Sequence, residues 1–197
     1  PSETNAGIDS TAYLVVRYDV YNNYSSNQSN VISLSSSSTG SNKRFSLTTP
    51  STPGSAVSTV TMPIGGRLTS AINTTSETTI YVSTTNQFQV PGCVLIDTEK
   101  IYYTSKTANT LDNCTRGAFS STAATHSNGA IVTPVGVFYY YDEKASYAPP
   151  DSPSSFTITV SATIPTPTDT KNIVVHPATI SKLAFSTNPV TVVAGDW

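Results

Sequence analysis

The fold of this chain is decided by one stretch, residues 92–117, which reads GCVLIDTEKIYYTSKTANTLDNCTRG. It contains three short runs rich in β-branched and aromatic residues, which are residues 93–96, 99–105 and 110–115. The links between them, Asp97-Thr98 and residues 106–109, carry residues that favour tight turns. The pattern predicts a meander of three antiparallel strands joined by hairpins.

This register predicts where the two cysteines lie in the sheet. Turns at the two links place Cys93 opposite Tyr102 and Cys114 opposite Tyr103. The cysteines then lie on strands two apart in the sheet, roughly 9.6 Å from each other. A disulfide requires Cα atoms within about 7 Å. We therefore predict two free, buried thiols that pack as small hydrophobic groups.

The sequence on either side of the meander also reads as short strands. The clearest is residues 156–164, where Phe, Ile, Val and Ala alternate with Thr and Ser. Further strands are expected at 12–20, 31–34, 44–48, 56–62, 78–83, 137–141, 172–175, 180–186 and 189–193. The pattern predicts an all-β fold of several short-strand modules, sandwich-like or barrel-like, with long loops rich in Ser, Thr and Asn.

The chain divides into three segments by its turn and loop signals. Residues 1–66 are expected to form an amino-terminal β-segment with an extended arm, and residues 67–135 contain the meander. Residues 136–197 are expected to form a sandwich-like carboxy-terminal segment. The first and third segments are candidates to complete one sandwich, with the second inserted between them.

Composition argues against several classes of protein. Charged residues make up only 11% of the 197 residues, and the formal net charge is −2. Lys43-Arg44 is the only basic cluster, so nucleic-acid binding through phosphate contacts is not expected. No apolar run approaches the length of about 18 residues that a membrane-spanning helix needs, so no membrane partner is expected. The 11 Tyr and 6 Phe residues argue against disorder.

Residues able to do chemistry are few. The two histidines, His126 and His176, lie far apart in sequence, and a zinc site or a Ser/His/Asp triad needs more partners at workable spacing. Asp97 and Glu99 are the one carboxylate pair that suits a glycosidase. However, an Asp in a two-residue turn has a local role in capping its own backbone. We expect no catalytic residue, no cofactor and no metal, and hence no enzyme.

Tyrosine-rich runs with few charges point to protein contacts instead. Tyrosine offers a large contact area at low entropic cost, and interface cores are depleted of charge. The contact candidates are Tyr13, Tyr18, Tyr21, Tyr24, Tyr139, Tyr140 and Tyr141. The alternative, equally weighted, is that alternate tyrosines line the core.

A set of residues in fixed order carries a family resemblance. It consists of IDTEKIYYT at 96–104, NTL at 109–111, TRG at 115–117 and TAATHSNGAIV at 122–132. With the preceding residues 68–82, this pattern resembles a module that recurs in tailed-bacteriophage virion proteins, and it covers roughly residues 67–135. The chain departs from the module at Phe119-Ser120-Ser121, where Gly-Thr is common.

The resemblance implies a structural part of a phage particle, in the tail, neck or fibre or as a capsid decoration. Such a protein is located in the virion and is assembled in the host cytoplasm. Its partners are copies of itself and other virion proteins, with a host-surface glycan as a further partner. By matching position, Glu99, Arg116 and His126 form a polar framework: Arg116 pairs with Glu99, and His126 ties the Ala-rich loop to the sheet.

Other functions stay open. Residues 180–195 are similar to the opening of bacterial immunoglobulin-like repeats. The second hypothesis is a subunit of a bacterial or archaeal extracellular filament joined by donor strands, which suits the arm at residues 1–10. The third is a carbohydrate-binding adhesin domain, which predicts an exposed aromatic platform with Asn or Asp beside it.

Overall fold

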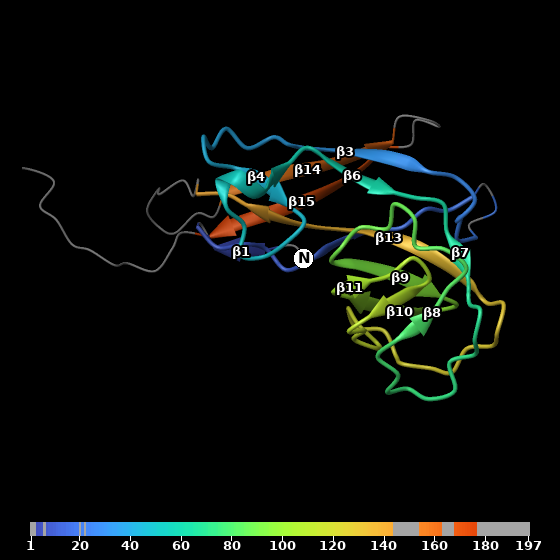
Figure 1. Cartoon of the computed structure of the whole chain (residues 1–197). Helices are drawn as coiled ribbons and strands as arrows, with labels where there is room; N and C mark the ends of the chain where they lie inside the picture. The colour runs from blue at the N-terminus through green and yellow to red at the C-terminus, as the bar shows by residue number, and fades with distance from the viewer. Residues whose placement is uncertain are drawn as a thin grey trace, which may run out of the picture.

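A computed structural model describes residues 3–5, 7–19, 21, 23–143, 154–162 and 168–176 (Figure 1). These residues form an all-β protein with one short 3-10 turn, η1 (Pro53–Ser55), which confirms the predicted fold class. The strands are β1 (Glu3–Asn5), β2 (Tyr13–Val15), β3 (Asn30–Ser36), β4 (Arg44–Ser46), β5 (Ala56–Val57), β6 (Thr59–Met62), β7 (Gly66–Arg67), β8 (Ile80–Tyr81), β9 (Gly92–Ile96), β10 (Glu99–Tyr103), β11 (Ser105–Lys106), β12 (Thr110–Asp112), β13 (Ile131–Tyr141), β14 (Ser154–Ala162) and β15 (Thr168–His176).

The predicted register of the meander is confirmed, but its third strand is shortened to β12 and lies in a separate sheet with the order β11-β12-β8. Strands β9 and β10 pair antiparallel with Cys93 opposite Tyr102. Strand β11 continues the line of β10 and pairs with β12, and Tyr102 also bridges to Thr115 in the same register. The turn between β9 and β10 has Asp97 at φ 52°, a left-handed conformation that Asp tolerates better than most residues.

The 11-residue strand β13 connects the meander to the strands of the amino-terminal β-segment (Figure 1). It pairs with β7 and β9 near its start, with β2 in its middle and with β4 at its end. Side chains alternate along a strand, so Val132, Phe138 and Tyr140 share one face, while Val135 and Val137 share the other. The boundary expected after residue 135 falls inside this strand.

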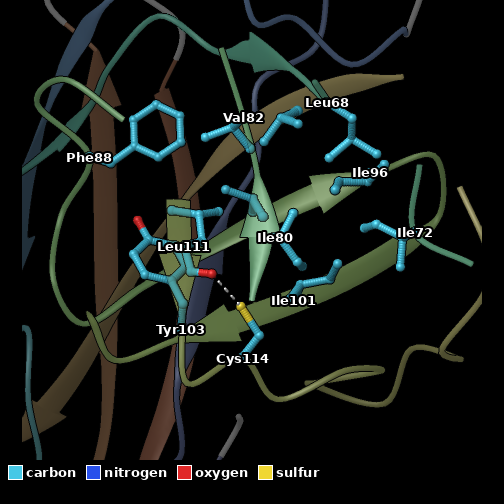
Figure 2. Close-up of a cluster of buried hydrophobic side chains, with 12 residues drawn as sticks. Leu68, Ile72, Ile80, Val82, Phe88, Ile96, Ile101, Tyr103, Leu111 and Cys114 are labelled. Atoms are coloured by element: carbon cyan, nitrogen blue, oxygen red, sulfur yellow. Dashed lines mark hydrogen bonds between the residues drawn. The ribbon is translucent and has the colours of Figure 1, made fainter. Parts of the chain in front are cut away.

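The first core lies inside the meander and the segments packed on it (Figure 2). Its buried members all come from residues 68–132: Leu68, Ile72, Ile80, Val82, Phe88, Val94, Ile96, Ile101, Tyr103, Leu111, Cys114 and Val132. Burial of each large aliphatic or aromatic side chain stabilises the fold by about 1.5–3 kcal/mol. The Cys114 Sγ lies among them and donates to the Leu111 carbonyl oxygen at 3.3 Å.

The second core lies between two sheets that pack face to face, as in a β-sandwich. One sheet has the strand order β1-β15-β14-β3-β6, and the other contains β2, β4 and β13. The buried side chains between them are Tyr13, Ile32, Leu34, Phe45, Val60, Met62, Phe138, Tyr140 and Ile158. The amphipathic strand expected from residue 156 is β14, and its Ile158 is buried here.

The strand expected at residues 12–20 is shorter than predicted. Only Tyr13–Val15 forms β2, because Arg17 turns away and donates to the carbonyl oxygens of Met62 and Pro63 at 3.3 and 2.8 Å. Tyr18 then pairs with Tyr24 in a separate β-bridge. The strands expected at 180–186 and 189–193, and the similarity at 180–195, lie outside the described residues.

Candidate functional site

The polar framework residues converge on one buried carboxylate. Glu99, on β10, has a fully buried side chain. Arg116 Nε donates to Glu99 Oε1 and Arg116 Nη2 donates to Oε2, both at 2.8 Å. This two-pronged geometry matches the planar guanidinium to the planar carboxylate and gives a strong, directional pair.

Three further groups bind the same carboxylate. The Gly117 N–H donates to Oε1 at 2.9 Å, and the Ala124 N–H donates to Oε2 at 3.0 Å. His126 Nε2 lies 2.8 Å from Oε2. The backbone of the loop that follows β12 is therefore folded around the Glu99 side chain, which satisfies N–H groups that would otherwise be buried without an acceptor.

Arg116 and His126 also form hydrogen bonds to neighbouring segments of the chain. Arg116 also donates to the carbonyl oxygens of Thr74 and Ala124, at 2.9 and 2.5 Å. His126 Nδ1 lies 2.7 Å from an oxygen of Asp97, and its backbone exchanges two hydrogen bonds with Ile72. The structure thus brings Glu99, Arg116 and His126 together. It also adds Asp97, for which the sequence suggests a turn role or a carboxylate pair with Glu99 but no contact with His126.

The electrostatics of Glu99 favour a framework role. Burial by itself raises the pKa of this carboxyl, but hydrogen bonds from Arg116, the Ala124 N–H, His126 and the Gly117 N–H outweigh it and hold the pKa at about 2. A glycosidase acid needs a pKa shifted in the opposite direction, so that it is protonated near neutral pH. The lowered pKa of Glu99 therefore does not suit this side chain to act as such an acid.

The structure separates the contact tyrosines into buried and exposed residues. The contact role expected for Tyr13 and Tyr140 is wrong: they are 7% and 0% exposed, because the alternation of β2 and β13 turns them into the second core. Tyr140 Oη donates to Asp142 at 2.7 Å. Tyr139 and Tyr141 are half-buried on β13.

The exposed residues are Tyr18, Tyr21 and Tyr24, at 53%, 82% and 45% exposure. We call the segment 17–25 the tyrosine loop; residues 20 and 22 lie outside the described residues. The rings of Tyr18 and Tyr24 lie 5.2 Å apart between centroids, with an interplanar angle of 34°. A group of exposed aromatic side chains on one loop is a candidate contact surface, because a partner that covers the rings removes their apolar area from water.

Asp19 fixes the backbone of the tyrosine loop. Its Oδ1 accepts the N–H groups of Tyr21 and Asn23 at 2.9 and 2.8 Å, and its Oδ2 accepts the Asn23 side-chain amide at 3.2 Å. The Asp19 N–H in turn donates to the Asn23 carbonyl oxygen at 2.8 Å. The sequence analysis did not predict this role. The available signal was the position of Asp19, two residues before Tyr21 and four before Asn23, which suits an Asp that caps backbone N–H groups.

The base of the loop is attached to residues 62–65. Arg17 donates to the carbonyl oxygens of Met62, Pro63 and Gln28, and the Gly65 N–H donates to Ser26 O at 2.7 Å. The guanidinium of Arg17 is thereby engaged beneath the loop. The surface that the loop presents is aromatic and carries the carboxylate of Asp19.

A polar recess lies between residues 84–86 and 106–109, with a volume of about 540 Å³. Its lysine, Lys106, donates to the Thr85 carbonyl oxygen at 2.8 Å, and the Asn109 amide donates to Ser83 O at 3.1 Å. These groups tie the two segments to each other. Their hydrogen bonds give the recess a structural role in closing the first core.

The described ranges contain no cluster of three or more His, Cys, Asp or Glu side chains able to hold a metal, and no helix long and apolar enough to span a membrane. Comparison with family models, with curated proteins and with solved structures finds no match to this chain.

Proposed function

We propose that this chain is a non-enzymatic structural component of a bacteriophage virion, in the tail, neck or fibre or as a capsid decoration. It works by assembling with copies of itself and with other virion proteins. The observation that carries the proposal is the tyrosine loop, where three exposed aromatic side chains stand on a backbone fixed by Asp19. A loop ordered in advance loses less entropy when a partner binds, and tyrosine supplies contact area with few rotatable bonds.

The Glu99 network supports the same function. It ties the loop after β12 to β10 and to residues 72–74 by hydrogen bonds, which favours a fixed shape for the meander module. A virion protein must hold its neighbours at fixed positions, and a rigid module serves that purpose. The sequence resemblance of residues 67–135 to virion modules supports the location in a phage particle.

The test compares two exposed tyrosines. Tyr21→Ser removes the most exposed ring of the tyrosine loop, and Tyr81→Ser removes an exposed ring on β8 as a matched control. We expect sedimentation velocity over a concentration series to show oligomers of the wild-type chain, at least tenfold weaker association for Tyr21→Ser, and no change for Tyr81→Ser. A wild-type chain that stays monomeric, or equal effects of the two variants, would contradict the proposal.

The tyrosine loop also favours a second candidate, an extracellular adhesin domain that binds a glycan. Tyrosine rings stack on the apolar faces of sugars, and the polar side chains Asp19 and Asn23 lie on the same loop, where they are hydrogen-bonded to each other. Saturation-transfer NMR with a panel of neutral oligosaccharides separates the two candidates. Binding that is lost in Tyr21→Ser and kept in Tyr81→Ser favours the adhesin, and absence of binding with intact self-association favours the virion component.

A further inference from the structure

The amino-terminal strand β1 is held at the outer edge of the five-stranded sheet (Figure 1). It pairs in parallel with the end of β15, with Glu3 opposite Val174, Thr4 opposite Val175 and Asn5 opposite His176. The other edge of β15 is fully occupied by β14 over eight residue pairs. Strand β1 is therefore an addition to a sheet that is already formed without it.

The residues after β1 are attached to the other sheet. The Gly7 N–H donates to the Asp142 carbonyl oxygen at 2.9 Å, and the Ser10 N–H donates to Tyr140 O at 2.8 Å. Residues 3–5 thus pair with one sheet, while Gly7 and Ser10 are hydrogen-bonded at the end of β13 in the other. Gly7, at φ +76°, adopts the left-handed conformation that glycine permits and that suits a change of direction.

The pairing of β1 within its own subunit is weak. Among the described residues three pairs hold it, and parallel pairs are slightly less stable per residue than antiparallel ones. The entropy lost in ordering each residue is of the same order as the net gain from its hydrogen bond. A neighbouring copy held beside the chain offers the same edge at a high local concentration.

We propose that, in the assembled state, β1 of one subunit pairs with β15 of a second copy of this chain. This inference rests on the proposed assembly function and names its partner. An exchanged strand keeps the same three residue pairs, so the second copy is complementary without any new surface. The segment before Gly7 is the part that changes partner, while the contacts of Gly7 with Asp142 and of Ser10 with Tyr140 remain within each subunit.

The test uses two single-cysteine variants, Thr4→Cys and Val175→Cys, purified separately and then mixed at concentrations that give oligomers. The two positions face each other in the register, and neighbouring strands lie about 4.8 Å apart, within the range for a disulfide. Cys93 and Cys114 are buried and do not compete. The matched control replaces Val175→Cys with Thr170→Cys, which lies on β15 beyond the reach of β1.

We expect non-reducing gels of the oligomer fraction to show the disulfide dimer between Thr4→Cys and Val175→Cys chains, at least tenfold above the Thr170→Cys control. Deletion of residues 1–6 should weaken association at least tenfold with an unchanged near-ultraviolet circular dichroism spectrum. Oligomers that form without the 4–175 dimer would overturn the exchange and leave the assembly function standing. A wild-type chain that is monomeric at all concentrations would overturn both.

Discussion

Arg116 and Glu99 form a two-pronged ion pair, with both N–O distances at 2.8 Å and the carboxylate fully buried. A buried ion pair is stable only when the remaining lone pairs and N–H groups are also satisfied. Here the Gly117 and Ala124 N–H groups and the His126 ring complete the shell. The pair therefore fixes the loop after β12 as well as joining two side chains.

Replacement of the Glu99 carboxylate should destabilise the fold strongly. Glu99→Gln keeps the shape but turns an amide –NH₂ toward donors and leaves Arg116 without a counter-charge. We expect the free energy of unfolding, measured in urea, to fall by about 3–5 kcal/mol. Glu143→Gln, at an exposed carboxylate that binds Asn42 and Tyr141, is the matched control and should change it by less than about 0.5 kcal/mol. Equal losses in the two variants would contradict the central role of Glu99.

The stability should also depend on pH through Glu99. Its pKa is about 2 in the folded chain and 4.5 in the reference state, so the folded state favours the ionised form. The resulting contribution, about 3 kcal/mol, is fully present above pH 5 and is lost as the pH falls from about 5 to 2. Urea unfolding between pH 2 and 7 measures it. Between pH 5 and 2, the free energy of unfolding should fall more steeply for the wild type than for Glu99→Gln. Parallel curves for the two proteins would contradict the contribution of Glu99.

Gly117 should not tolerate a side chain. It has φ +60°, and a Cβ there would lie 2.9 Å from the Ala123 nitrogen and 3.1 Å from the Ser121 oxygen. We expect Gly117→Ala to lower the free energy of unfolding by about 1–3 kcal/mol. Gly54→Ala, whose Cβ would meet nothing closer than 3.9 Å, serves as the control and should be neutral. A neutral Gly117→Ala would mean that the loop can refold around Glu99.

The two thiols should be inert in the folded protein. Burial raises the pKa of both Cys93 and Cys114 to about 12, which removes the reactive thiolate near neutral pH. We expect labelling by a thiol reagent at pH 8 to be at least roughly 100-fold slower in buffer than in guanidinium, where both react. Thr104→Cys, at an exposed position, is the positive control. Fast labelling of either native thiol in buffer would show that the meander opens readily.

Local pattern was enough to predict the meander, because each of its elements is encoded within a few residues. The Asp97-Thr98 turn sets the register, and the register places Cys93 opposite Tyr102. The alternation from residue 156 likewise predicts β14, because one face of that strand is buried. The Glu99–Arg116 pair came from the family pattern, since opposite charges 17 residues apart do not by themselves indicate contact.

Contacts between distant segments were not predictable in the same way. Alternation along β13 does not say which tyrosines face the core until the partner sheet is known, so the sequence left Tyr140 open between a contact role and a place in the core, and the structure puts it in the core. The parallel pairing of β1 with β15 joins residues that are 171 positions apart, such as Glu3 and Val174 (174 − 3 = 171), and three residues carry no periodic signal. The capping of the tyrosine loop by Asp19 could not be predicted either, because several kinds of Asx turn share the same sequence pattern and differ only in backbone geometry.

The most direct measurement of the assembly function is an electron cryomicroscopy map of the assembled particle at side-chain resolution. We expect Tyr18, Tyr21 and Tyr24 of each copy to be buried against a neighbouring protein, with Asp19 still capping the loop. A map in which these three tyrosines face solvent in every copy would contradict the proposed function.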